Sequence, residues 1–233
     1  VLARTETQRG LLGARGFRNL DIWPGAVDTE LFRPADKGDL DLPRPIAMYV
    51  GRVAPEKNIE AFLNLDLPGS KVVIGGGPSL ETLRNRYPGV HFPGYKHGRE
   101  LARSLACADV FVFPSLTDTL GLVNLEAMAC GVPVAAFPVA GPADLVVEGR
   151  NGALDEDLRE AVFRALAVLP EHCVAFAAHY SWQRSTRQFL EMLIPARPAS
   201  AAGNEDSPKL AYNPEPCPSH RPVPKSTSTS PAN

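Results

Sequence analysis

The sequence has 233 residues, of which 44% are hydrophobic and 21% are charged, so an ordinary globular core can form over most of it. The length permits one large domain or two small ones. Lys and Arg number 24 against 26 Asp and Glu, a formal charge of -2, which excludes the broad positive field of nucleic-acid-binding proteins. No apolar run approaches the roughly 20 residues of a spanning helix, and no secretory signal pattern is present. We therefore expect a cytoplasmic protein without a nucleic-acid partner.

Short apolar runs alternate with helical patterns between residues 45 and 193. The expected strands cover residues 45–51, 71–74, 90–92, 109–113 and 132–137. The first expected helix starts at Pro55 and runs to Leu63. The second includes Leu80 and Leu83, and the third includes Leu101 and Ala106. The others cover about 121–130, 156–168 and 181–193. Strands that are apolar on both faces and alternate with helices predict an α/β fold, with a Rossmann-like parallel sheet covered by helices on both faces.

The last 39 residues differ in composition from the rest of the chain. Nine of the 23 prolines lie between Pro195 and Asn233, and large apolar side chains are few there. Such a segment cannot bury enough apolar surface to offset the entropy of ordering. We therefore predict a disordered tail rich in Pro, Ser and Thr over residues 195–233.

Ligands of parallel α/β sheets bind beyond the carboxyl ends of the strands, where the connections diverge. Three of the expected strand ends carry glycines or polar residues that suit a phosphate site: Gly51-Arg52, Gly75-Gly76-Gly77 and the segment 114–118. The functional residues are therefore expected at this edge of the sheet.

The segment 114–134 combines two acids with a helix start. Gly121, Leu122 and Val123 lie where the helix is expected to begin, and free backbone N–H groups and the helix dipole favour a phosphate there. Asp118 precedes this point and Glu126 lies one turn into the helix. An acid on each side of a phosphate site fits a nucleotide sugar, because carboxylates accept hydrogen bonds from paired hydroxyls.

Each acid also has a purely structural interpretation. Asp118 could cap the helix and Glu126 could be a solvated helix residue. Glu126, however, is flanked by Leu125, Ala127 and Met128 in a segment that looks buried on several faces. A buried carboxylate needs a partner, which favours the binding interpretation for Glu126.

Arg52 and Lys57 follow the first strand after Gly51 and precede or open a helix. Two cations at this edge can neutralise a diphosphate and stabilise the charge that builds on a leaving group. The alternative is two solvated surface cations, with Lys57 paired to Glu60 or Glu56.

The remaining candidates give weaker signals. Gly75-Gly76-Gly77-Pro78 fails the dinucleotide fingerprint because Leu80 stands where the last glycine should be, so it is mainly a tight turn whose backbone at Gly76 could line a nucleotide pocket. The four cysteines and five histidines show no metal-ligand spacing, so we expect no metal site, reduced thiols and no cofactor.

Several ordered motifs together resemble a known family. VDTELFRP (27–34), YVGRVAPEKN (49–58), ADVFVFPS (108–115) and TDTLGLVNLEAMACGVPV (117–134) resemble the C-terminal, donor-binding domain of retaining GT-B glycosyltransferases of family four. The resemblance covers roughly residues 1–193. It implies that residues 1–26 are a remnant of an N-terminal domain and its linker, and that residues 27–194 form the nucleotide-sugar-binding domain.

The resemblance also implies a reaction and a set of roles. The reaction is metal-independent transfer of a hexose from a nucleoside diphosphate sugar to an acceptor hydroxyl with retained configuration. Asp118 stands where the family usually has glutamate, which leaves the donor sugar unassigned. The implied catalytic residues are Arg52 and Lys57 on the diphosphate and Asp118 on the donor sugar; the implied donor-binding residues are Glu126 on the ribose, the amides of Gly121, Leu122 and Val123 on the phosphate, and Gly51 and Gly76.

A GT-B enzyme closes two domains around its substrates, and the sequence resembles one of them. We therefore expect a fragment whose acceptor, a glycan or a lipid, would be bound by a missing N-terminal domain, with peripheral association at the cytosolic face of a membrane through that domain. The alternatives are a non-catalytic interaction module or an inactive truncated remnant, motivated by the exposed inter-domain face. A nucleotide-sugar epimerase of the same fold is disfavoured because the acid/base groups it needs are not found.

Overall fold

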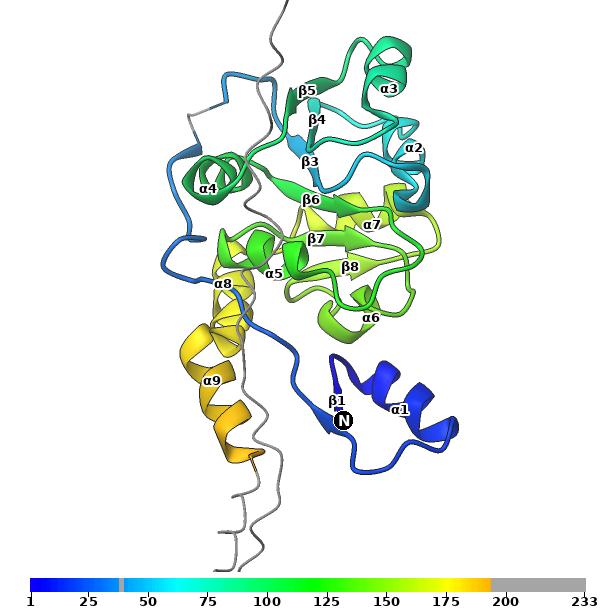
Figure 1. Ribbon diagram of the computed structural model, residues 1–233. Coiled ribbons are helices and arrows are strands. Elements are labelled where there is room, and N and C mark those ends of the chain that lie inside the picture. The colour runs from blue at the N-terminus through cyan, green and yellow to red at the C-terminus, as the bar shows by residue number, and fades with distance from the viewer. Residues whose placement is uncertain (38–39, 194–233) are drawn as a thin grey trace, which may run out of the picture. The chain divides into compact units, whose positions relative to one another are not determined.

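A six-stranded parallel sheet forms the centre of this computed structural model, which describes residues 1–37 and 40–193 (Figure 1). The predicted tail over 195–233 lies outside the described residues. The strands are hydrogen-bonded in the order β5-β4-β3-β6-β7-β8. Their bounds are β3 (Ile46–Val50), β4 (Ser70–Ile74), β5 (His91–Gly94), β6 (Val110–Phe113), β7 (Val134–Ala136) and β8 (Gly152–Leu154).

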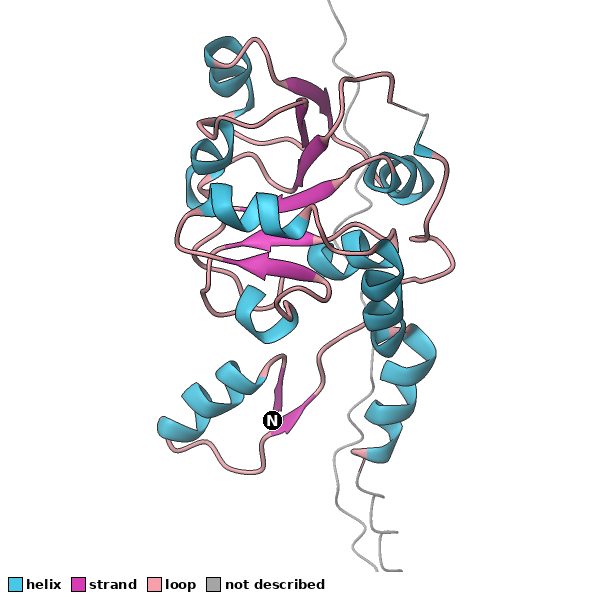
Figure 2. Cartoon of the chain, turned by 180° about the vertical axis from the view of Figure 1, so that it is seen from behind, coloured by secondary structure: helices cyan, strands magenta, loops and turns pink. Residues whose placement is uncertain are grey.

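Helices cover both faces of the sheet, as Figure 2 shows from behind. On one face, Ile46, Met48 and Val50 of β3 share a core with α4 (Gly98–Ala106), α5 (Leu122–Ala129), α6 (Pro142–Leu145) and α8 (Pro170–Ala177). On the other face, Ala47 and Tyr49 pack with α2 (Ile59–Leu63), α3 (Leu80–Arg86) and α7 (Leu158–Ala165). Successive residues of a strand point to opposite faces, so β3 contributes to both cores. The predicted fold class is confirmed.

The sequence missed β8, α8 and the four-residue helix α6. Strand β8 has three residues and begins at Gly152, so no apolar run marks it. Helix α8 begins at Pro170, a normal first position, but its interior residues Cys173 and Ala177 are small and give a weak periodicity.

The helix predicted from Pro55 to Leu63 was also wrong in part. Residues Pro55–Lys57 form a 3-10 turn, and Asn58 then adopts the left-handed conformation with φ 52° before α2 begins at Ile59. The left-handed residue breaks the helix in two and sets the direction of Lys57 independently of α2.

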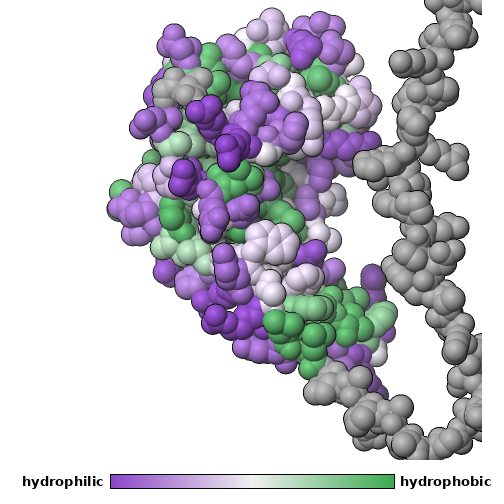
Figure 3. Space-filling model, turned by 60° about the vertical axis from the view of Figure 1, so that its left-hand side comes forward, coloured by the Kyte–Doolittle hydropathy of each residue, from purple (hydrophilic) through white to green (hydrophobic). Residues whose placement is uncertain are grey.

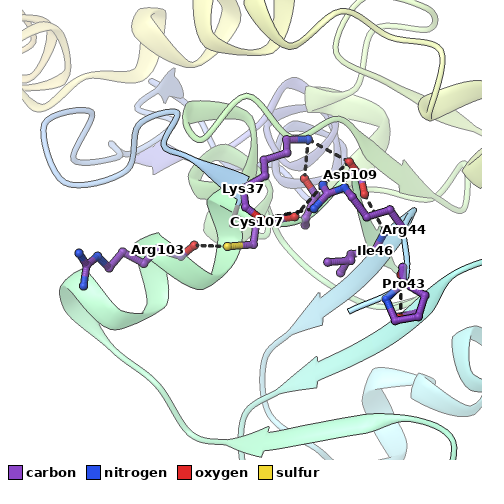
Figure 4. A network of polar contacts seen from close by, with 9 residues as sticks. Lys37, Pro43, Arg44, Ile46, Arg103, Cys107 and Asp109 are labelled. Atoms are coloured by element: carbon purple, nitrogen blue, oxygen red, sulfur yellow. Dashed lines mark hydrogen bonds and ion pairs between the residues drawn. The ribbon is translucent and has the colours of Figure 1, made fainter. Parts of the chain in front are cut away.

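The carboxylate of Asp109 fixes β6 to β3 at their amino ends (Figure 4). One oxygen accepts from the Ile46 N–H at 2.7 Å, and the other accepts from Arg44 at 2.5 Å and Lys37 at 3.0 Å. Arg44 also donates to the Cys107 carbonyl at 3.1 Å. Burial alone would raise the pKa of Asp109, but the Ile46 N–H and the two cations hold it below its ordinary value.

Residues 1–26 form a small βαβ unit of β1 (Leu2–Ala3), α1 (Glu6–Ala14) and β2 (Asp21–Ile22), with β1 and β2 paired in parallel. This unit contacts α9 (Trp182–Glu191) through Trp23, whose indole N–H donates to the Ser185 carbonyl at 3.1 Å and whose ring lies 5.2 Å from that of Phe189. The chain reaches the sheet domain at Val27, whose N–H donates to the carbonyl of Tyr180 in η3 (Ala178–Tyr180).

Trp182 and Leu190 on α9 are exposed, and so is Leu193 just after the helix. Figure 3 shows apolar side chains gathered at the lower end of one face.

None of the described helices is by itself long and apolar enough to cross a membrane. Among the described residues, α7 and the segment Pro170–Tyr180 are long and apolar enough only when taken together, and the two are bent by 98° relative to each other.

The glycine turn after β4 provides a stability test with a built-in control. A Cβ at Gly75, whose φ is +145°, would lie 1.8 Å from the Gly51 carbonyl oxygen, whereas a Cβ at Gly76 would meet nothing within 4 Å. Gly75→Ala is therefore expected to lower the free energy of unfolding by about 2 kcal/mol or more, and Gly76→Ala by less than about 0.5 kcal/mol. Urea denaturation measures both values; equal losses would contradict the close packing of the two loops.

Candidate functional site

The connections leave β3 and β6 toward opposite faces of the sheet. The two strands are adjacent and parallel, but α2 packs on one face and α5 on the other. This arrangement is a topological switch point, where ligands of open α/β sheets bind at the carboxyl ends. The loop after β3 carries Gly51, Arg52 and Lys57, and the loop after β6 carries Asp118 and Gly121.

Two side-chain contacts join these loops across the switch point. The Lys57 ammonium donates to Asp118 Oδ2 at 2.9 Å, with 27% of the Lys57 side chain and 20% of the Asp118 side chain exposed. Asn58 Nδ2 donates to the Pro114 carbonyl at 3.0 Å. Lys57 is therefore neither a solvated cation nor a partner of Glu56 or Glu60, and Asp118 is not the cap of α5.

Arg52 pairs with a different acid. Its guanidinium contacts Glu56 at 3.0 Å, and 64% of its side chain is exposed. Its carbonyl accepts from the Tyr49 hydroxyl at 2.9 Å. Burial, then the charges of Asp118 and Glu56, raise the pKa of Tyr49. The structure thus fixes the backbone of Arg52 at the site, while the side chain must turn to reach a ligand held by Lys57.

Helix α5 begins where the sequence predicted a phosphate site. Gly121 precedes it with φ 69°, and a Cβ there would lie 2.6 Å from Asn124 Nδ2 and 3.1 Å from the Phe113 ring. Only glycine fits this position. The N–H groups of Leu122 and Val123 have no intrahelical acceptor and lie at the positive end of the helix dipole, whereas the Asn124 N–H donates to the Gly121 carbonyl at 2.8 Å.

The amide of Asn124 is a polar group that sequence analysis missed. Asn124 is fully buried, and neither its oxygen nor its nitrogen has a hydrogen-bond partner within residues 1–37 and 40–193. An unpaired buried polar group costs about 1–3 kcal/mol. Its only sequence signal is a polar residue in the apolar run LVNLEAMA. The amide lies directly beneath Gly121, so unsatisfied polar groups gather at the start of α5.

Glu126 is half-buried on α5, and burial raises its pKa. Among the described residues, its carboxylate makes no hydrogen bond or ion pair that would compensate. Burial first, and then the charge of Glu126, also raise the pKa of the Cys130 thiol to about 12, which makes Cys130 unreactive as a nucleophile. A desolvated carboxylate without an internal partner is suited to accept hydrogen bonds from a pair of ligand hydroxyls.

The glycine turn after β4 packs directly on the loop after β3. Gly51 N–H donates to the Ile74 carbonyl at 3.0 Å, and Val53 N–H donates to the Gly76 carbonyl at 2.9 Å. Gly51 and Gly76 therefore both lie at the carboxyl edge of the sheet. The space beside Gly76 is open, which leaves its backbone accessible to a ligand.

Asp118 also borders a cavity of about 260 Å³ whose opposite wall is α1. Helix α1 is held against α6 by Thr7, whose N–H and hydroxyl donate to Asp144 Oδ1 at 3.2 and 2.9 Å. The cavity is lined by Thr5, Thr7, Gln8, Leu11, Leu12, Arg15, Asp118, Thr119 and Ala140. A larger cavity of about 860 Å³, between residues 28–35 and α4, contains none of the predicted site residues.

Within the part of the chain that the structure describes, no three His, Cys, Asp or Glu residues lie close enough to hold a metal ion. Cys107, Cys130 and Cys173 are buried and form no disulfide. The groups that the structure brings to the switch point are cations, carboxylates and backbone N–H groups.

Glu126 links stability to pH in a predictable direction. Because its pKa is raised in the folded protein, its carboxylate destabilises the fold as the pH rises through that value. Glu126→Gln is expected to raise the melting temperature by about 2 °C near pH 7.5, and the gain should vanish below about pH 4, where the carboxyl is protonated in both states. Thermal melts between pH 3.5 and 8 test this, with Glu160→Gln on the exposed surface as the control. A gain that does not depend on pH would contradict it.

Asn58 separates a backbone effect from a side-chain effect. Asn58→Gly keeps access to the left-handed conformation but loses the hydrogen bond to Pro114, at a cost of about 1 kcal/mol. Asn58→Ala loses both, so its unfolding free energy should fall by about 1–2 kcal/mol more. Urea denaturation should rank the parent above the glycine variant and the glycine variant above the alanine variant. Equal stability of the two variants would show that φ 52° imposes no constraint.

Comparisons with known proteins agree with this geometry. Residues 44–171, more than half of the chain, match the family model for glycosyl transferases group 1. A sulfoquinovosyl transferase of Arabidopsis thaliana is 35% identical over 60% of this chain and 30% of its own length. A GDP-mannose-dependent alpha-mannosyltransferase of Mycobacterium tuberculosis is 34% identical over 64% of this chain and 42% of its own length. The chain thus spans well under two thirds of these relatives.

The fold has a counterpart among solved structures. HepE from Anabaena, crystallised in complex with UDP, superposes with a TM-score of 0.69 at 18% sequence identity, over 82% of this chain and 62% of HepE. At this identity the likeness concerns the fold alone. Together with the match over residues 44–171, the switch-point loops and the sheet order place the chain in a family: it belongs to the glycosyl transferases group 1.

Proposed function

We propose that this chain is the donor-binding part of a retaining, metal-independent glycosyltransferase that moves a hexose from a nucleoside diphosphate sugar to an acceptor hydroxyl. The single observation that carries the proposal is the meeting of Lys57 and Asp118 at 2.9 Å across the switch point. The contact brings together an ammonium, which can bind a phosphate, and a carboxylate, which can accept hydrogen bonds from sugar hydroxyls. HepE with bound UDP and the GDP-mannose-dependent relative support a nucleotide donor.

The proposed roles follow from the groups that are free to act. Lys57, and Arg52 after its side chain turns inward, hold the diphosphate and stabilise the charge that develops as the sugar departs. The N–H groups at the start of α5 bind a phosphate oxygen. Glu126 accepts the ribose hydroxyls, and Asp118 accepts hydroxyls of the hexose.

The acceptor site requires more protein than the chain supplies. The matches cover 30% and 42% of the two relatives' own lengths, so the proposed enzyme uses this chain as part of a larger polypeptide or with a second chain. The proposed acceptor is a glycan or a lipid, bound in the cytoplasm or at the cytosolic face of a membrane.

Calorimetry with UDP, GDP, ADP and their nucleotide sugars tests the proposal. The parent chain is expected to bind one nucleoside diphosphate series, and the double variant Arg52→Ala, Lys57→Ala is expected to bind it about 100-fold more weakly, since both phosphate cations are gone. The control double variant Arg84→Ala, Arg86→Ala removes the same charge from α3 and should leave affinity within about twofold. A parent chain that binds no nucleoside diphosphate would overturn the proposal.

One observation favours a non-catalytic interaction module as a second candidate. Arg52 is paired with Glu56 and largely exposed, so one of the two proposed catalytic cations is not oriented toward Lys57. Sugar transfer by a polypeptide that contains this chain, abolished by Lys57→Ala, would exclude the second candidate. Nucleotide binding without transfer would support it.

A further inference from the structure

A diphosphate bound at the switch point would compete with the Asp118 carboxylate for the Lys57 ammonium. Lys57 donates to Asp118 Oδ2 at 2.9 Å, and about three quarters of each side chain is shielded from solvent. The ammonium has three N–H donors, so a diphosphate can share Lys57 with Asp118, but a diphosphate that draws the ammonium fully to itself displaces Asp118. Asp118 would then lie unpaired beside the new negative charge, which costs the lost ion pair and adds like-charge repulsion in a partly desolvated place.

The second cation does not impose the same cost. Arg52 and Glu56 are 64% and 49% exposed, and a surface pair of this kind contributes little. Its carboxylate can also move into solvent when Arg52 turns toward a ligand. The main competition is therefore between the diphosphate and Asp118 for the Lys57 ammonium.

The loops are held at a fixed separation while this exchange takes place. Asn58, adjacent to Lys57, donates to the Pro114 carbonyl at 3.0 Å, four residues before Asp118. The backbone around both side chains is thus anchored, and the exchange needs only a rotation of the Lys57 stem. Asp118 stays within reach of Lys57 in either arrangement.

A hexose changes the balance. Sugar hydroxyls can donate to the displaced Asp118 and restore the hydrogen bonds that it loses from Lys57. A nucleoside diphosphate without its sugar offers no such donors. We propose that Asp118 discriminates between the intact donor and the free diphosphate, and that it expels the diphosphate product by taking back Lys57 once the hexose has left. This inference rests on the proposed function and concerns the order of affinities at that same site.

The test compares two ligands on one variant. Calorimetry with GDP and GDP-mannose, and with UDP and UDP-glucose, gives both affinities for the parent and for Asp118→Asn. Asparagine no longer competes for Lys57, so the free diphosphate is expected to bind about tenfold more tightly, while the nucleotide sugar binds equally or more weakly. In transfer reactions, inhibition by the diphosphate product should strengthen by the same factor.

Three controls keep the interpretation specific. Glu60→Gln, which removes an exposed carboxylate from α2, should change neither affinity more than about twofold. In a Lys57→Met background, Asp118→Asn should tighten diphosphate binding by a clearly smaller factor than in the parent, because only the like-charge repulsion is removed and the ion pair is already broken. Asp118→Ala, checked by its melting temperature, should reproduce the tightening.

The outcomes separate this inference from the proposed function. If the parent binds the nucleotides and Asp118→Asn changes both ligands by the same factor, or weakens the diphosphate, Asp118 has only a structural or sugar-binding role and the inference is overturned. If the parent binds neither ligand, the proposed function fails first and this inference with it.

Discussion

The pairing of β3 with β6 is the constraint on which the rest of the structure depends. The two strands are adjacent in the sheet but distant in the chain, and polar contacts hold them at both ends. At the amino ends, Asp109 binds the Ile46 N–H and two cations. At the carboxyl ends, Asn58 and Lys57 reach Pro114 and Asp118. Because both ends are fixed, the loops that follow the strands keep a defined spacing, and a site built on them inherits that spacing.

The sequence predicts the sheet well where a strand contributes side chains to the cores on both faces of the sheet. The run Ile46–Val50 is apolar at every position because alternate residues face opposite helical layers. Such a continuous apolar run can be recognised from the sequence without knowledge of the neighbouring strands. The sequence fails where tertiary packing replaces local preference. The first residue of β8 is glycine because a Cβ at position 152 would lie 2.1 Å from the Val134 carbonyl oxygen. This constraint comes from the neighbouring strand and leaves no apolar residue to mark the start of β8. The left-handed conformation of Asn58 was also not predicted, because Pro55 is a typical first residue of a helix and suggests that the helix continues through residue 58.

The sequence indicates the edge of the sheet where the candidate site lies, but it does not indicate the contacts within that site. Glycines, cations and acids at strand ends indicate the edge of the sheet. The partner of Lys57 is 61 residues away, while two glutamates lie within three residues of it, so local reasoning favours the wrong pair. The opposite holds for Arg52, which does take the local partner Glu56. The resemblance assigns both cations to one ligand, and the contacts show that they begin from different environments.

The two ends of the β3–β6 pair differ in how completely their polar groups are satisfied. Asp109 accepts from three donors, and its pKa falls despite burial. At the other end, Glu126 has a raised pKa and the buried Asn124 amide is unpaired among the described residues, while Asp118 depends on a lysine that a phosphate could take. A fold gains nothing from unsatisfied groups that cluster at one edge. Ser185 on α9 also has a buried hydroxyl that is unpaired within the part of the chain that the structure describes, but Asn124 and Glu126 lie within two residues of each other on α5, at the end of the strands opposite Asp109, and this difference supports the proposal that a ligand binds at this edge.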